Sequence, residues 1–294
     1  MRVQALSVTG GGLLAAAALA APLATERPVR ATRLAELYPV ASGGYLAWAQ
    51  GKRPVNPRRL QVYIRRPTGR IARVTRRGGW GLPGSIDARR LAFVEHVRGK
   101  YDLGRFFLHD LRTGRRSALK VGNKAPFLLQ PPQLSGRYLL YSGYSQIGSG
   151  TWLRSLATGH ERQVAPGYLA TQLNGNYGAL FTCDDVSCSV ARYSVSARRL
   201  TIVSPDDPLS SFSAPSIAPD GTLYEVQDDA KECGSARLVR VPLKGPTSVV
   251  FSFPAGTGVV STWAVATAPR TTVYYTRARC GSSDYDLYKL DLGA

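Results

Sequence analysis

A short apolar run with an aromatic residue recurs six times along this chain, and this repeat limits the folds that the chain can adopt. The aromatic residues are Trp48, Phe93, Tyr141, Phe181, Tyr224 and Tyr274. They are separated by 45, 48, 40, 43 and 50 residues. A strand-rich unit of this length cannot bury both of its faces alone and must stack on copies of itself. We expect the six aromatic residues to pack at equivalent positions between the units.

Each unit can be divided into four strands, most clearly in the second unit. Its predicted strands are Leu82–Ile86, Leu91–His96, Phe106–Asp110 and Ser117–Leu119. Glycine-containing pairs such as Asn174–Gly175 supply tight turns between strands. Six such units predict an all-β, six-bladed β-propeller of four-stranded antiparallel blades. The alternative is a two-sheet or solenoid β-fold.

The two ends of the chain indicate how the ring closes. The last unit stops soon after its third predicted strand, Asp286–Leu290, so its fourth strand is missing. Before the first unit lies an unassigned segment of strand length, Arg27–Thr32. We expect this segment to fill the last blade, because a closed ring leaves fewer strand edges exposed to aggregation.

The first 24 residues differ from the rest and predict a secretory signal peptide, with the propeller at residues 25–294. Arg2 is their only charged residue, and residues 13–20 are apolar. Ala18 and Ala20 suit cleavage after Ala20. An uncleaved membrane anchor is the alternative, although Pro22 disfavours a spanning helix. No later segment is apolar enough to span. The sequence thus predicts a secreted or cell-envelope protein, which we expect to be a monomer.

All four cysteines lie in the last 40% of the chain, and an even number in an exported protein favours disulfides. Cys183 and Cys188 flank a predicted hairpin tip and are expected to pair. Cys233 and Cys280 would then form the second bond. Four free thiols are the alternative. The spacing does not suit zinc.

Charge is distributed unevenly. The chain carries +19 overall, of which residues 1–180 contribute +20 and residues 181–294 contribute −1. A positive field attracts anionic surfaces, and outside the cytoplasm these are envelope polymers or lipid head groups rather than nucleic acid. A general preference for arginine as a surface residue is the alternative. The candidate binding residues are Arg76, Arg77, Trp80, Arg89 and Arg90.

Catalytic patterns are scarce. The chain has three histidines, His96, His109 and His160, and no Gly-x-Ser-x-Gly motif. Acidic pairs occur at Asp184–Asp185, Asp206–Asp207 and Asp228–Asp229. Calcium needs several oxygen ligands that converge, and these pairs fall mainly in outer connections. We therefore expect no catalytic residue, metal or cofactor.

Two segments resemble the repeat of TolB-like propellers. Ser216–Tyr224 resembles its Ser-Pro-Asp-Gly turn followed by an apolar strand. Ser85–Val94, with Phe107–Gly114 after it, is similar to the same repeat at greater length. As a repeat pattern, the resemblance covers about residues 25–294. It implies a noncatalytic scaffold that binds proteins or other ligands through its loops and channel.

Two functions follow from these observations. The first is a secreted, noncatalytic propeller that binds a protein or an anionic cell-envelope component through its loop face. The alternative is a calcium-assisted hydrolase or lyase that acts on polysaccharide, an interpretation that rests on the acidic pairs and on analogy with other propellers.

Overall fold

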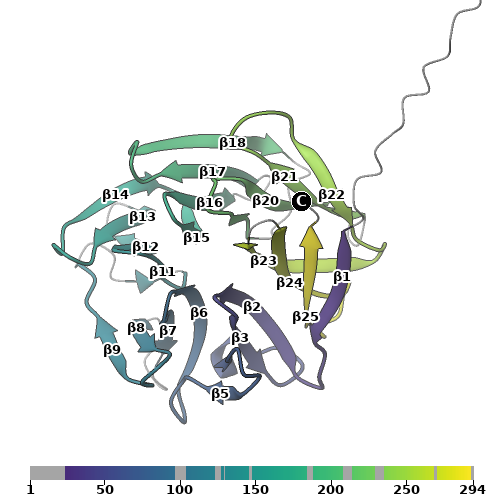
Figure 1. Cartoon of the computed structure of the whole chain (residues 1–294), viewed down its shortest axis with the longest axis horizontal. Coiled ribbons are helices and arrows are strands. Elements are labelled where there is room, and N and C mark those ends of the chain that lie inside the picture. The colour runs from purple at the N-terminus through teal and green to yellow at the C-terminus, as the bar shows by residue number, and fades with distance from the viewer. Residues whose placement is uncertain are drawn as a thin grey trace, which may run out of the picture.

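The computed structural model describes residues 24–96, 104–122, 127–128, 130–145, 148–183, 188–207, 214–228, 235–267 and 270–292. Within these residues the chain forms 25 strands and one short 3-10 helix, η1 (Pro57–Arg59). The strands form six antiparallel sheets that fan around an axis (Figure 1). The prediction of an all-β, six-bladed propeller is confirmed.

Each blade runs from an inner strand beside the axis to an outer strand at the edge. Blades one to three contain β2 (Ala35–Ser42), β3 (Tyr45–Gly51), β4 (Gln61–Arg65), β5 (Ile71–Arg73); β6 (Trp80–Asp87), β7 (Arg90–His96), β8 (Gly104–Asp110), β9 (Arg116–Leu119); and β11 (Gln133–Ser135), β12 (Tyr138–Ser145), β13 (Gly148–Ser155), β14 (Glu161–Pro166). A short additional strand, β10 (Phe127–Leu128), also pairs with β12.

Blades four to six follow the same order. They contain β15 (Leu169–Asn174), β16 (Tyr177–Cys183), β17 (Cys188–Ser194), β18 (Arg199–Asp207); β19 (Ser216–Ile217), β20 (Leu223–Asp228), β21 (Ala236–Val241), β22 (Ser248–Ser252); and β23 (Thr257–Thr267), β24 (Arg270–Arg279), β25 (Asp286–Leu292), β1 (Thr25–Arg30). Each inner strand contacts the inner strands of both neighbouring blades, so the six close a ring.

The ring is closed by the two ends of the folded chain. Strand β1 pairs antiparallel with β25, with Thr25 opposite Asp291 and Arg30 opposite Leu287. In Figure 1 the purple β1 lies beside the yellow β25. The predicted closing strand is therefore confirmed, with its bounds two residues earlier than expected.

Glycines end the inner strands where the sequence predicted tight turns. Gly136, Gly175 and Gly221 follow the inner strands of blades three, four and five, and their φ angles are 56°, 57° and 85°. A residue with a Cβ rarely adopts this left-handed conformation. Glycine therefore allows the chain to reverse at these points.

Most of the repeating aromatic residues lie in the core. Four of the six are fully buried: Trp48, Phe93, Tyr141 and Tyr224. In blade six the fully buried residue is Tyr275, while Tyr274 is half-buried; in blade four it is Leu180, while Phe181 is half-buried. The prediction was therefore wrong by one residue in these two blades. A shift of one residue turns a side chain to the other face of a strand.

Candidate functional site

The propeller has two faces, which we name by their connections. The connection face carries the links between the second and third strands of each blade, and the links from each outer strand to the next inner strand. The turn face, on the opposite side, carries the turns between the first and second strands and between the third and fourth strands. Each inner strand runs from the connection face to the turn face.

The structure separates the predicted binding residues between these faces. Arg76, Arg77 and Trp80 lie at the connection face, before and at the start of β6. Arg89 and Arg90 follow the end of β6, at the turn face. Since β6 has eight residues and a strand rises ~3.3 Å per residue, the two groups lie roughly 25 Å apart. They cannot form one compact site.

Arg90 joins blades two and three. Its guanidinium donates to Asp87 Oδ2 at 3.0 Å and to the carbonyl oxygen of Gly136 at 2.8 Å. The same carboxylate oxygen accepts the backbone N–H of Gly136 at 2.9 Å. The side chain of Arg90 therefore forms part of the contact between the two blades. Arg89, in contrast, is exposed.

The group at the connection face is exposed and rests on a buried platform. Arg76 and Arg77 are exposed, and Trp80 is half-buried. The indole of Trp80 stacks on the buried imidazole of His96, with the ring centroids 3.7 Å apart and the planes 2° apart. The backbone N–H of Arg76 donates to Glu95 Oε1 at 2.7 Å. The turn and the indole therefore have a fixed position relative to β7.

A second arginine pair lies beside this group. Arg58 and Arg59, in η1, are exposed. Gly81 N–H donates to the carbonyl oxygen of Leu60 at 2.9 Å, which fixes η1 against the start of β6. The side chain of Gln61 also donates to the carbonyl oxygen of Gly79. We call Arg58, Arg59, Arg76, Arg77 and Trp80 the basic rim. The sequence showed both arginine pairs, but only the fold places them together.

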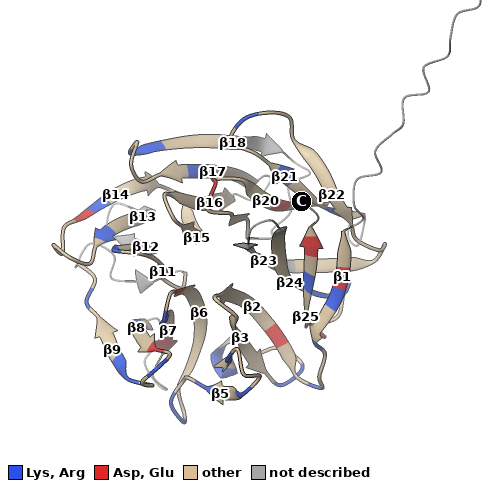
Figure 2. Ribbon diagram, in the orientation of Figure 1, with Lys and Arg blue, Asp and Glu red and all other residues tan. Residues whose placement is uncertain are grey.

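Glu95, which contacts the backbone of Arg76, does not neutralise the basic rim. Glu95 is buried and forms an ion pair with Arg116, with the guanidinium nitrogen and carboxylate oxygen 2.5 Å apart. Among the described residues, no carboxylate forms an ion pair with Arg59, Arg76 or Arg77. Other basic residues are scattered over the outer strands and connections of the ring (Figure 2).

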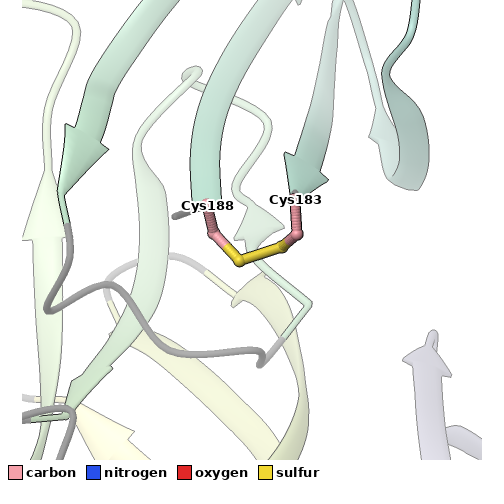
Figure 3. The surroundings of a disulfide bond; sticks show 2 residues. All are labelled: Cys183 and Cys188. Atoms are coloured by element: carbon pink, nitrogen blue, oxygen red, sulfur yellow. A yellow bond between two sulfur atoms is a disulfide. The ribbon is translucent and has the colours of Figure 1, made fainter. Parts of the chain in front are cut away.

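The predicted cysteine pair is confirmed at the connection face. Cys183 ends β16 and Cys188 begins β17, and the two are bonded across the hairpin (Figure 3). Cys280 is also disulfide-bonded. Its predicted partner, Cys233, lies outside the described residues. Oxidised cysteines are typical of proteins outside the reducing cytoplasm.

The histidines and the acidic pairs do not form a common centre in the described part of the chain. His96 supports Trp80, while burial and the nearby Arg116 and Arg66 lower the pKa of His109. Asp184 and Asp185 lie outside the described residues. Within residues that are described, no group of three His, Cys, Asp or Glu side chains could hold a metal ion.

The axis of the ring holds a cavity of about 300 Å³ between the inner strands. Its described lining includes Tyr38, Leu82, Gln133, Phe181 and Trp263 and contains no acidic, basic or histidine side chain. Phe181 thus lines the channel, which explains why it is not part of the core between blades. A second cavity of about 220 Å³ lies toward the turn face, and Trp263 lines both.

No helix among the described residues is long and apolar enough to cross a bilayer.

No protein-family model and no curated protein matches the chain. Solved structures do match. A gluconolactonase from Xanthomonas campestris is 14% identical with a TM-score of 0.61, over 94% of this chain and 93% of that one. A putative TolB from Agrobacterium tumefaciens is 13% identical with a TM-score of 0.57, over 90% of this chain and 92% of that one.

TolB from Acinetobacter baumannii is 15% identical with a TM-score of 0.54, and the match covers 84% of this chain and 63% of that one. Identities this low establish the fold and not the activity. The fold fits a binding propeller but is also that of a hydrolase. The expected resemblance is therefore confirmed: this chain is a TolB-like six-bladed propeller in its fold.

Proposed function

We propose that this protein is an exported, noncatalytic propeller that binds an anionic cell-envelope component, a polymer or an acidic protein surface, through the basic rim. The observation that carries the proposal is the convergence of two arginine pairs, from η1 and from the turn before β6, beside a half-buried indole. The described lining of the axial cavity carries no charged side chain, and this together with the scarcity of catalytic motifs in the sequence favours binding over hydrolysis.

The chemistry of the basic rim suits an extended anion. Arginine presents planar donor groups that match carboxylates and phosphates. Several exposed guanidinium groups together attract a repeating anion over a longer distance at low salt, because the Debye length is then longer. Trp80 adds an apolar surface whose orientation is fixed by His96. Tryptophan and arginine are the residues that most often dominate binding energy at interfaces.

The experiment removes the four arginine charges of the basic rim. It compares the effect on binding with that of removing four arginine charges elsewhere on the protein. The variant carries Arg58→Gln, Arg59→Gln, Arg76→Gln and Arg77→Gln. The probes are poly-L-glutamate and an isolated cell-envelope fraction, at low and high salt. We expect the variant to bind both probes at least about tenfold more weakly at low salt, because each exposed ion pair contributes up to ~1 kcal/mol.

The matched control removes four exposed arginines of the turn face, Arg70, Arg89, Arg112 and Arg115. The net charge of the two variants is the same, so a general electrostatic effect would weaken both equally. Equal weakening, or no retention of the unmodified protein even at low salt, would contradict the proposal. A Trp80→Ala variant then tests whether the indole contributes beyond charge.

Export is tested separately. We propose that residues 1–24 contain a cleaved signal peptide, and the disulfide Cys183–Cys188 supports an oxidising location. The mature protein, recovered outside the cytoplasm of the producing cell, is expected to begin at Ala21. Intact mass measurement checks this. A full-length protein found only in the membrane fraction would instead support the uncleaved anchor.

A further inference from the structure

The axial cavity has features of a ligand site that is distinct from the basic rim. All six blades contribute to its wall, through Tyr38, Gly84, Gln133, Thr171, Ala214 and Trp263. Side chains such as Tyr38, Leu82 and Phe181 are only half-buried, so part of their surface is free to contact a small molecule. Its volume of about 300 Å³ is at the lower end of the range for small-molecule pockets, ~300–1,000 Å³.

The pairing of three inner strands becomes irregular where these strands line the cavity. The register of β2 with β3 shifts between Leu37 and Val40. A shift also occurs in β6 at Gly84 and in β15 at Thr171. The extra residues at all three irregularities line the cavity. Bulges often occur beside functional sites, because the additional residue redirects a side chain out of the regular strand pattern.

Tyr38 shows that this backbone is strained. Its φ angle is +54°, in the left-handed region that residues other than glycine seldom adopt. Burial also raises the pKa of its hydroxyl, so the side chain is neutral at physiological pH. Strained residues tend to cluster at ligand sites, where the surrounding fold holds them in place.

The lining selects for an uncharged molecule. None of the described lining residues is Asp, Glu, Lys, Arg or His. A charged ligand would lose its hydration there without gaining an opposite charge. The wall instead presents Trp263, Phe181 and Tyr38 together with three prolines, Pro39, Pro83 and Pro131. Such flat apolar surfaces suit a planar molecule of small size.

Gln133, in the cavity wall, has a side-chain oxygen without a hydrogen-bond partner among the described residues. It is only 3% exposed, and its Nε2 donates to the carbonyl oxygen of Pro131 at 3.0 Å. That bond determines which end of the amide is the oxygen. Gln133 Oε1 is buried and accepts no hydrogen bond from any described residue. Buried acceptors are nearly always satisfied in folded proteins, so this oxygen is suited to a donor from a bound molecule.

Three other polar side chains of the wall, those of Thr171, Thr262 and Trp263, already form hydrogen bonds. Thr171 donates to the carbonyl oxygen of Pro215 at 2.6 Å, and Thr262 donates to that of Ala214 at 2.8 Å. The indole N–H of Trp263 donates to the carbonyl oxygen of Ala41 at 3.1 Å. These bonds tie neighbouring blades together. Gln133 differs from these side chains, because its acceptor atom Oε1 has no hydrogen-bond partner among the described residues.

We propose that the axial cavity binds a small, uncharged, planar molecule that donates a hydrogen bond from an N–H or O–H group to Gln133 Oε1. This inference goes beyond binding at the basic rim and does not depend on it, because the two sites share no residue.

Two probes of nearly equal shape test the proposal, indole and 1-benzofuran. Indole has an N–H donor and 1-benzofuran has none. Titration calorimetry and ligand-observed saturation-transfer NMR measure the binding of each. We expect the unmodified protein to bind indole about fivefold more tightly, the difference that one neutral hydrogen bond makes. In Gln133→Met, which has a similar volume, this preference is expected to disappear while binding of 1-benzofuran is retained.

A variant that fills the cavity provides the second arm. Ala214→Phe places a ring in the lining and is expected to weaken both probes at least tenfold. Its control is Ala197→Phe, at an exposed turn-face position, which should leave both affinities unchanged. Thermal unfolding of each variant shows that it is folded.

The proposal is overturned if neither probe binds the unmodified protein at millimolar concentration. It is also overturned if Ala214→Phe binds both probes normally, or if the preference for indole persists in Gln133→Met.

Discussion

Blades three and six contain equivalent tyrosine–glutamate contacts, but they build them from very different parts of the chain. In blade three, Tyr141 donates its hydroxyl to Glu161 on the outer strand, 20 residues later. In blade six, Tyr275 donates to Glu26 of β1, a residue 249 positions away. The contact in blade three is formed within one continuous segment of the chain, whereas the contact in blade six joins the two ends of the propeller.

The packing around the two tyrosines is also similar. Tyr141 stacks on Trp152 of its own blade and meets Phe106 of blade two edge-on. Tyr275 stacks on Tyr288 and meets Phe253 edge-on. Burial and the bond to glutamate raise the pKa of both tyrosines. The closing strand therefore supplies the same side-chain contact as an ordinary outer strand, in addition to its backbone pairing with β25.

The largest effect is expected from removing the closing strand. A chain that begins at residue 31 lacks β1, exposes the edge of β25 and leaves Tyr275 without its acceptor. We expect it to lose cooperative unfolding, since the loss approaches the whole stability of a typical domain, ~5–15 kcal/mol. The control begins at residue 24. Melting curves measured by circular dichroism compare the two. Equal melting temperatures would show that closure contributes little.

A smaller effect is expected from Glu161→Ala in blade three. The side chain of Glu161 is 10% exposed. Besides Tyr141, it accepts the backbone N–H of Gly122 at 3.0 Å. Its removal leaves two donors unsatisfied, which should lower the free energy of unfolding by about 2–4 kcal/mol. Urea denaturation measures the change. A double-mutant cycle with Tyr141→Phe should show coupling between the two side chains.

Glu26→Ala in blade six should cost less, about 1–3 kcal/mol. The side chain of Glu26 is 23% exposed, so water can replace part of what is lost. The removal also frees Arg277, whose guanidinium lies 2.7 Å from Glu26 Oε1. The same urea measurement applies. A cost larger than that of Glu161→Ala would mean that the closing contact is more than a copy of the one in blade three.

The smallest effect is the pH dependence of stability at the contact between blades six and one. Glu36 is fully buried; its Oε1 accepts bonds from Thr32 and from Arg30, while burial raises its pKa above 4.5. The folded state therefore binds this proton more tightly than the unfolded state does. Stability from Glu36 is complete below pH 4.5 and is lost as the pH rises through the raised pKa.

Glu36→Gln should remove this dependence. The stability of the unmodified protein relative to the variant is expected to fall above pH 4.5, with a slope of at most ~1.4 kcal/mol per pH unit. Urea denaturation across the pH range measures it. Parallel stability profiles for the two proteins would show that Glu36 titrates normally.

Sequence patterns predicted much of the fold but little of the binding geometry. The Cys183–Cys188 bond was predictable because both residues flank one short turn, so local distance decides it. The basic rim was not, because Arg58 and Arg76 lie on different connections that only the packing of η1 against β6 brings together. Gln133 carried no signal in the sequence, since its unsatisfied oxygen results from how the inner strands meet at the axis.

The period of the apolar runs, the turn glycines and the unassigned segment before the first blade by themselves determined a six-bladed ring closed by its two ends. These features act over a few residues or repeat with a fixed spacing, and burial of strand faces then leaves few alternatives. The tertiary structure alone decided which arginines share a face, and that Tyr275 rather than Tyr274 is buried. Strand register and the meeting of distant connections depend on packing between blades, which no local pattern encodes.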